Sequence, residues 1–134
     1  MKKKNKSKSK DTVPELLVRR VLRSWGYGYR LHDSRLPGTP DIVFPKERIA
    51  VFIHGCFWHQ HGDCDFPKTS QIPREWRSKF KSTNIRDLNN LEKLRNLKWT
   101  PLVLWECKIL KSPKIEAERI TTHVELERRK KSKL

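Results

Sequence analysis

The stretch IAVFIHGCFWHQHGDC, residues 49–64, joins a short apolar run to a segment crowded with histidine and cysteine. Residues 49–53 are all apolar, and a run of this length between polar segments is typical of a buried strand. The eleven residues that follow, 54–64, contain three histidines, two cysteines and two aromatic residues. The stretch therefore predicts a functional site at the end of a buried strand.

A helix is predicted before this strand. Residues 12–15 read Thr-Val-Pro-Glu, which is the Ser/Thr-x-x-Glu pattern of a capping box with proline in the first turn. Gly26 provides a stop for the helix. Apolar residues recur on one face of the segment between these signals, at Leu17, Val18, Val21, Leu22 and Trp25.

The remaining pattern predicts an α/β fold. We expect strands at about 27–31, 41–44 and 100–106 in addition to 49–53, with helices at about 85–97 and from Ser112-Pro113 onward. The residues that these two helices are expected to bury are Leu88, Leu91 and Leu94 in the first and Ile115, Ile120 and Val124 in the second. The order of helix, three strands, helix and strand is typical of a mixed sheet flanked by helices.

The charge of the chain favours a polyanionic partner. Its 134 residues suit one domain, which we expect at 12–125, and its formal net charge is +16. Residues 1–10 carry six lysines and no acid, and residues 126–134 carry five bases and one acid. We therefore expect 1–11 and 126–134 to be disordered basic tails that add non-specific affinity for phosphates.

The sequence favours a location inside the cell. The N-terminal lysines lead into an amphipathic helix and not into the apolar core of a signal peptide. No segment approaches the roughly 18 apolar residues of a membrane span. The three cysteines are an odd number and lie among histidines, which argues against a disulfide framework.

The cysteines predict a structural zinc site. A Cys₃His ligand set has short spacings between its first three members and one distant member at the end of the strand predicted at 100–106. Its members are Cys56, His61, Cys64 and Cys107. Either His59 or Asp63 can replace His61 in this set, because spacing alone does not choose among them. The alternative is that Cys107 is a buried thiol and the others are loop residues.

Three further side chains are candidates for hydrolytic chemistry, and a fourth is a candidate partner. Asp41, at the start of a predicted strand, can hold Mg²⁺, which polarises a phosphodiester and acidifies a bound water. His54 or His59 can then transfer the proton, and Glu15 can orient such a histidine. Each of these residues, taken alone, also has a structural explanation. Asp41 can be a turn residue, His54 a core histidine and Glu15 a capping residue. Their grouping favours catalysis.

Aromatic residues beside cations suggest contact with bases. Phe57 and Trp58 lie in the polar loop, and Trp76 lies in the basic segment 74–79. Such side chains stack on bases or insert between base pairs. The alternative, that they cover the core, applies most to Trp99 and Trp105, on or near a strand.

Five motifs resemble the very short patch repair (Vsr) family of DNA mismatch endonucleases. They are Leu36-Pro37-Gly38-x-Pro40-Asp41-Ile42-Val43-Phe44, His54-Gly55-Cys56-Phe57-Trp58-His59-x-His61, Pro67-Lys68-Thr69, Arg86-Asp87 and Trp105-Glu106-Cys107. The resemblance runs from about Thr12 to Ile109. It implies a nuclease core of the restriction-endonuclease type with a structural zinc. It also implies nicking on the 5′ side of the thymine in a T:G mismatch left by deamination of 5-methylcytosine.

The resemblance also assigns roles by position. It implies that Asp41 and the main-chain carbonyl of Ile53 hold Mg²⁺, that His59 is a general base oriented by Glu15, and that His54 stabilises charge on the leaving side. It gives zinc the same Cys₃His set. It further implies DNA contacts by Phe57, Trp58, Trp76, Lys68 and Arg86, with a supportive role for Asp87.

The implied partner is double-stranded DNA carrying a T:G mismatch. A monomer in the bacterial cytoplasm, associated with the nucleoid, is implied, with accessory mismatch-repair proteins and DNA polymerase as further partners. The alternatives are a nicking or restriction endonuclease of the same core with another target, and a catalytically silent zinc DNA-binding module. The sequence departs from the family in its N-terminal lysine run, in Thr83 where the family has asparagine, and in Lys98 where it has glycine.

Overall fold

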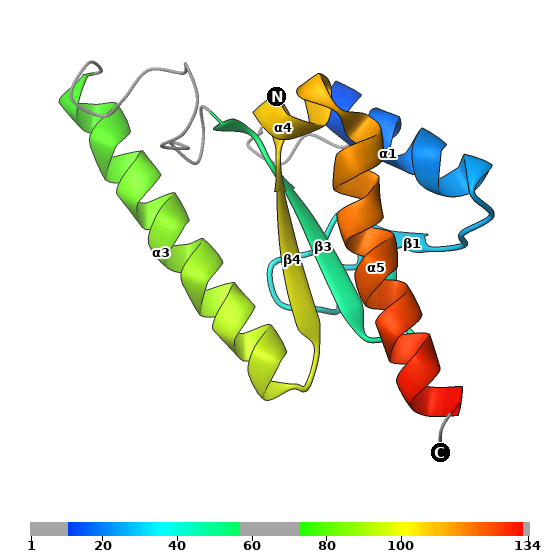
Figure 1. Ribbon diagram of the computed structural model, residues 1–134. Helices are drawn as coiled ribbons and strands as arrows, with labels where there is room; N and C mark the ends of the chain where they lie inside the picture. The colour runs from blue at the N-terminus through cyan, green and yellow to red at the C-terminus, as the bar shows by residue number, and fades with distance from the viewer. Residues whose placement is uncertain (1–10, 57–72, 133–134) are drawn as a thin grey trace.

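A computed structural model describes residues 11–56 and 73–132 (Figure 1). Its elements in chain order are α1 (Val13–Ser24), β1 (Arg30–Leu31), β2 (Ile42–Phe44), β3 (Ile49–His54), α3 (Arg74–Asn96), β4 (Thr100–Trp105), α4 (Glu106–Lys111) and α5 (Pro113–Ser132). Within these residues no helix is both long and apolar enough to cross a membrane.

The strands form one mixed sheet in the order β1-β2-β3-β4. β1 with β2 and β2 with β3 pair antiparallel, whereas β3 and β4 pair parallel. Five of the six residues of β3 are buried, as expected for a central strand covered on both faces. The predicted mixed sheet flanked by helices is therefore confirmed.

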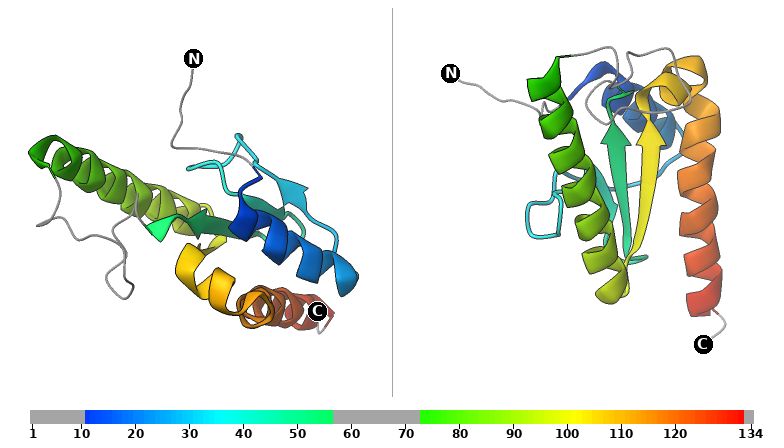
Figure 2. Two further views of the ribbon diagram at one scale, coloured as in Figure 1. Left: turned by 90° about the horizontal axis from the view of Figure 1, so that it is seen from above. Right: turned by 90° about the vertical axis from the view of Figure 1, so that its left-hand side faces the viewer.

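Helices cover the sheet from both sides and build two hydrophobic clusters. Figures 1 and 2 show α1, α4 and α5 on one side of the β3–β4 pair and α3 on the other. The larger cluster includes Val18 and Leu22 of α1, Val51 of β3, and Ile120 of α5, all fully buried. The smaller cluster joins Ala50 and Phe52 of β3 to Leu94 of α3. Side chains alternate between the faces of a strand, so β3 supplies both clusters.

Helix α1 starts and ends close to the predicted signals. Thr12 is the N-cap residue, and Gly26 follows the helix with φ +86°, where its N–H donates to the carbonyl of Arg23 at 3.0 Å. Val18 and Leu22 are buried, while Trp25 is 41 % exposed, so Trp25 lies outside the buried face. The predicted capping bond from the Thr12 side chain to the backbone does not form. The Thr12 hydroxyl instead donates to the Glu15 carboxylate at 3.5 Å.

Helix α3 begins at Arg74, well before the predicted start near residue 85. Its early turns are polar, and only Phe80 and Leu94 are buried along the whole helix, so apolar periodicity could not reveal them. The predicted burial of Leu94 is confirmed and Leu91 packs partly buried, but Leu88 is 65 % exposed and that prediction is wrong.

The C-terminal segment differs from the prediction in three respects. Residues 106–111 form the helix α4, so the preceding strand ends at Trp105 and not at Glu106. Ile120 and Val124 of α5 are buried as predicted, whereas Ile115 is 59 % exposed. Residues 126–132 continue α5 and are not a disordered tail. Ion pairs of Arg128 with Glu47 and of Lys130 with Glu127, both at 3.0 Å, help to order these basic turns.

Gly38 holds the Leu36–Asp41 loop against β3 and α3. Its φ is +80°, and a β-carbon built there would lie 3.0 Å from Cε1 of Phe52 and 3.1 Å from Cβ of Asn90. Both the backbone conformation and the close approach of two elements therefore require glycine. Gly26 has a similar φ of +86° but no atom within 4 Å of the same position.

The two glycines form a matched pair for a stability test. We expect Gly26→Ala to lower the free energy of unfolding by about 1–2 kcal/mol, because only the left-handed backbone opposes it. Gly38→Ala should cost a further ~1–3 kcal/mol, because Phe52 and Asn90 must move. Urea denaturation measures both, and equal losses in the two variants would show that the close approach has no energetic weight.

Candidate active site

Asp41 and Ile53 lie together at one end of the sheet. Asp41 directly precedes β2, and its main-chain N–H donates to the carbonyl of Val51 at 2.8 Å. The main-chain N–H of Ile53 donates to Oδ2 of Asp41 at 2.7 Å. A bond from a main-chain donor fixes the orientation of a carboxylate, which has capacity for several further partners. The β2–β3 ladder thus brings together the two residues that the sequence assigned to magnesium.

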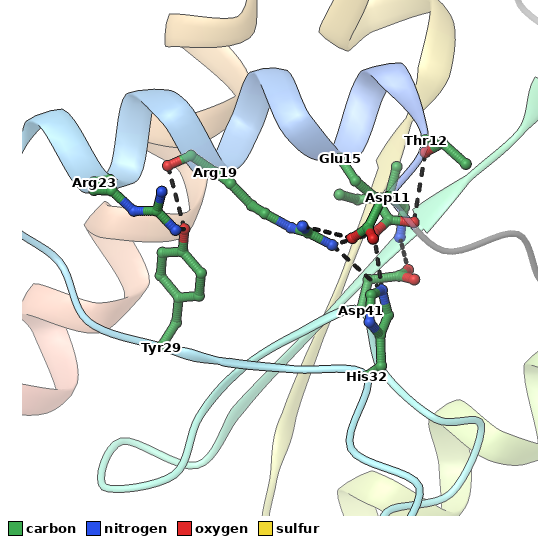
Figure 3. Close-up of polar contacts among 9 residues, drawn as sticks. Asp11, Thr12, Glu15, Arg19, Arg23, Tyr29, His32 and Asp41 are labelled. Atoms are coloured by element: carbon green, nitrogen blue, oxygen red, sulfur yellow. Dashed lines mark hydrogen bonds and ion pairs between the residues drawn. The ribbon is translucent and has the colours of Figure 1, made fainter.

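Glu15 is buried in the first turn of α1 and is bound by two basic side chains. Its Oε2 accepts hydrogen bonds from Nη2 of Arg19 at 2.7 Å and lies 2.9 Å from Nε2 of His32. Nη1 of Arg19 also pairs with Asp11 at 2.7 Å. Figure 3 shows this network gathered with Asp41 at the N-terminal end of α1. A buried carboxylate needs such partners, because burial without them is costly.

Asp11, Glu15 and His32 resemble a cation-binding group by distance alone, with their ligand atoms within 4.8 Å of one another. However, the guanidinium of Arg19 lies 2.7 Å from both carboxylates. A cation entering there would face this positive charge. The cluster is therefore an ion-pair network and not a metal centre.

Two residues of this network were missed by the sequence analysis. Arg19 follows Glu15 by four positions, the spacing of an ion pair on a helix, so a local signal was present. His32 is separated from Glu15 by 17 positions and reaches it only in the folded chain. His59, the predicted partner of Glu15, lies outside the described residues, so their pairing stays a prediction.

His54 is the last residue of β3 and lies at the same end of the sheet as Asp41 and Ile53. Its side chain is 9 % exposed, and its ring meets that of Trp105 edge-to-face with centroids 5.2 Å apart. Trp105 is also its partner in the β3–β4 ladder. The packing against Trp105 fixes the ring of His54. A fixed ring suits a group that must act at one point in space.

Cys56 and Cys107 meet beyond the ends of the parallel strands β3 and β4. The main-chain N–H of Cys107 donates to Sγ of Cys56 at 3.3 Å, and the N–H of Cys56 donates to Oε1 of Glu106 at 3.2 Å. Residues 51 positions apart are therefore in contact, as the strand order predicted. The other members of the predicted zinc set, His61 and Cys64, and the alternative Asp63 lie outside the described residues.

Helix α3 presents a basic surface on the other side of the sheet from α1. It carries seven basic and three acidic residues. Trp76 packs on Phe80 with ring centroids 6.1 Å apart, and Nζ of Lys79 lies 5.1 Å from the centre of its ring. Arg86 is exposed and Asp87 is half-buried farther along the helix. The other predicted DNA contacts, Phe57, Trp58 and Lys68, lie outside the described residues.

The loop that leads to Asp41 is held by a local ion pair. Asp33 accepts hydrogen bonds from the side chain and main chain of Arg35, at 3.0 Å in each case. These bonds, the side-chain bonds first, lower the pKa of the Asp33 carboxyl below its ordinary value. The charged form of Asp33 therefore closes the turn before Leu36.

Comparison with known proteins places this geometry in a family. The pattern of the family described as DNA mismatch endonuclease Vsr matches residues 1–65. The chain is 42 % identical over 114 residues to the type II nicking enzyme V.XorIIP of Xanthomonas oryzae pv. oryzae, covering 82 % of this chain and 81 % of that protein. It is 32 % identical over 117 residues to the DNA mismatch endonuclease Vsr of Escherichia coli, covering 87 % and 75 %. The chain belongs to the Vsr family.

Membership of the Vsr family establishes the general activity. The protein is a DNA endonuclease, a hydrolase that nicks its substrate, and the family points to metal-dependent hydrolysis. The alternative of a catalytically silent DNA-binding module is therefore wrong. A second nicking enzyme, V.NmeAIP of Neisseria meningitidis, is 40 % identical over 116 residues, covering 84 % of this chain and 79 % of that protein.

Proposed function

We propose that the protein nicks double-stranded DNA 5′ of the thymine in T:G mismatches that arise from deamination of 5-methylcytosine. The observation that carries the proposal is the contact of the Asp41 carboxylate with the Ile53 main chain, next to the buried His54. Likeness to the mismatch endonuclease of Escherichia coli supports the T:G target. Likeness to type II nicking enzymes favours a second candidate, a nicking endonuclease with a different target.

The donor set at the end of β2 and β3 fits Mg²⁺. A carboxylate and a main-chain carbonyl are oxygen ligands, which this ion prefers, so Asp41 and Ile53 would hold it. Bound there, the ion would polarise the phosphodiester and acidify water. The N–H of Ile53 holds Asp41 in one orientation, and Trp105 packs edge-to-face on His54, whose ring would stabilise charge on the leaving side. His59, oriented by Glu15, would accept the proton of the attacking water.

Recognition of the mismatch is assigned to a second set of residues. Phe57, Trp58 and Trp76 would insert beside the mismatch, because a T:G pair lowers the cost of unstacking. Arg86, Lys68 and the basic segment 1–11 would contact phosphates, which adds affinity without reading bases. Accessory mismatch-repair proteins and a DNA polymerase would act after the nick.

The target and the active site are tested together with end-labelled duplexes that differ only by T:G or C:G at one position. Wild type with Mg²⁺ should nick the T:G duplex far faster. Asp41→Ala should abolish nicking while leaving duplex binding nearly intact, because it removes a metal ligand and not a DNA contact. Glu118→Ala, which removes an exposed carboxylate of α5, is the control and should nick normally.

Two results would contradict this pair of proposals separately. Nicking by Asp41→Ala at close to the wild-type rate would move the active site elsewhere. Equal nicking of both duplexes by wild type would replace the T:G target with a sequence target, as in the second candidate.

We also propose that Cys56, His61, Cys64 and Cys107 hold a structural zinc ion. The contact of Cys107 with the fully buried Sγ of Cys56 supports it, because thiolates held by main-chain N–H groups suit metal binding. The ion would tie the loop after β3 to the end of β4.

Metal analysis should then find about one zinc per chain. Removal of zinc by a chelator should lower the melting temperature of wild type, because binding free energy contributes to folding. Cys107→Ser should start with less zinc and a lower melting temperature, and the chelator should change it little. A zinc-free wild type with full stability would contradict the site.

The proposed base is tested by rate and metal content together. His59→Ala should lower the nicking rate by ~10²–10⁴-fold, as expected for loss of a general base, and should keep its zinc. His123→Ala is the control, because the exposed His123 lies on α5 and, among the described residues, bonds only to the carbonyl of Arg119 in the same helix. Loss of zinc in His59→Ala would instead make His59 a metal ligand in place of His61.

A further inference from the structure

His32 contacts both acidic residues of the site. Its Nε2 lies 2.9 Å from Oε2 of Glu15, and its main-chain N–H donates to the main-chain carbonyl of Asp41 at 3.1 Å. The second bond continues the β1–β2 ladder, in which Leu31 pairs with Ile42. A single residue therefore fixes the position of Glu15 through its side chain and that of Asp41 through its backbone.

The backbone of His32 is strained in order to make these contacts. Its φ is +46°, in the left-handed region that residues with a β-carbon avoid. Its side chain is only 14 % exposed, so the ring is held inward and not released to solvent. Such conformations persist where the surrounding structure enforces them, and they concentrate at functional sites.

Arg19 alone would balance the charge of Glu15 but would not fix its carboxylate. The guanidinium is shared, with Nη2 on Glu15 and Nη1 on Asp11, so it does not form a two-bond fork with Glu15. Its Nε is buried and has no acceptor among the described residues. A single bond from Arg19 leaves the plane of the carboxylate free to rotate, and a second donor on Oε2 stops that rotation.

His32 is that second donor. Since an ionised carboxylate only accepts hydrogen bonds, we assign the ring proton of His32 to Nε2, which lies 2.9 Å from Oε2. The 3.4 Å approach of Nη2 of Arg19 to the same nitrogen is then a contact between two donors. Within the described part of the chain, Oε1 of Glu15 receives only the 3.5 Å bond from Thr12. Oε2 is thus fixed, and Oε1 keeps capacity for a further donor.

We propose that His32 is a positioning residue of the nicking reaction, acting through Glu15. It sets the plane of the Glu15 carboxylate, and so the direction in which Oε1 is offered to a catalytic histidine. The proposal rests on the role given to Glu15 under the proposed function. It predicts that the loss of His32 slows the chemical step without weakening the binding of DNA.

Two substitutions separate positioning from stability. His32→Gly removes the ring and also the backbone strain, so its melting temperature should stay within a few degrees of wild type. His32→Gln keeps the strain but places an amide donor within reach of Glu15. For positioning, Gln should keep kcat within a few-fold of wild type, while Gly should lower kcat at least tenfold with KM unchanged. The substrate is whichever duplex, T:G or fully paired, wild type nicks fastest.

A purely structural role gives the opposite order. The unstrained Gly variant would then be at least as active as Gln, and that result would overturn the proposal. Equal loss of kcat in the two folded variants would overturn it as well. Rescue by Gln combined with a normal KM in Gly would support it.

Double variants separate this proposal from the assignment of the site. Because His32 acts through Glu15, His32→Gly should cause no further loss of kcat in a Glu15→Gln background. Multiplied losses would overturn the path through Glu15. Asp41→Ala in the same assay reports on the site itself: an active Asp41→Ala refutes the proposed active site, whatever the His32 variants show.

Discussion

Strand β3 is hydrogen-bonded along both edges, and the placing of the aspartate, the histidine and the cysteines of the candidate site depends on the register of those two ladders. The antiparallel ladder to β2 sets Asp41 beside Ile53. The parallel ladder to β4 sets His54 opposite Trp105 and brings Cys56 to Cys107. A slip of one residue would turn the side chains of β3 to the opposite faces. Burial of β3 on both sides therefore fixes the fold and the site at once.

A second constraint is the buried charge at the start of α1. Glu15 and Arg19 are both nearly inaccessible, and each would be costly without the other. Their pairing lets α1 bury Val18 and Leu22 in the larger cluster while it presents a carboxylate at the edge of the sheet. His32 then links this helix to the β1–β2 ladder. Helix packing and strand register therefore act on the same few polar atoms.

The sequence predicted the features of the fold that depend on short-range patterns. The apolar run 49–53 is β3, Gly26 ends α1, and the strand order brought Asp41 to Ile53 and Cys56 to Cys107. It did not predict the polar turns of α3 before residue 85 or the helical residues 126–132, because neither segment has an apolar face. The contact of His32 with Glu15 was not predicted, because it depends on a left-handed backbone and joins residues 17 positions apart. Neither feature can be read from local spacing.

A basic helix lies beside the loop that leads to Asp41. Helices α1 and α3 lie on opposite faces of the sheet (Figure 2), and Gly38 of that loop packs against α3, which carries seven basic residues. Only Phe80 and Leu94 of α3 are buried, so the other residues of this helix can change without disturbing the core. Phosphate contacts from such a surface position DNA, and base contacts specify it. The relatives include both a mismatch endonuclease and type II nicking enzymes, and a surface that can vary in this way lets one fold serve different targets.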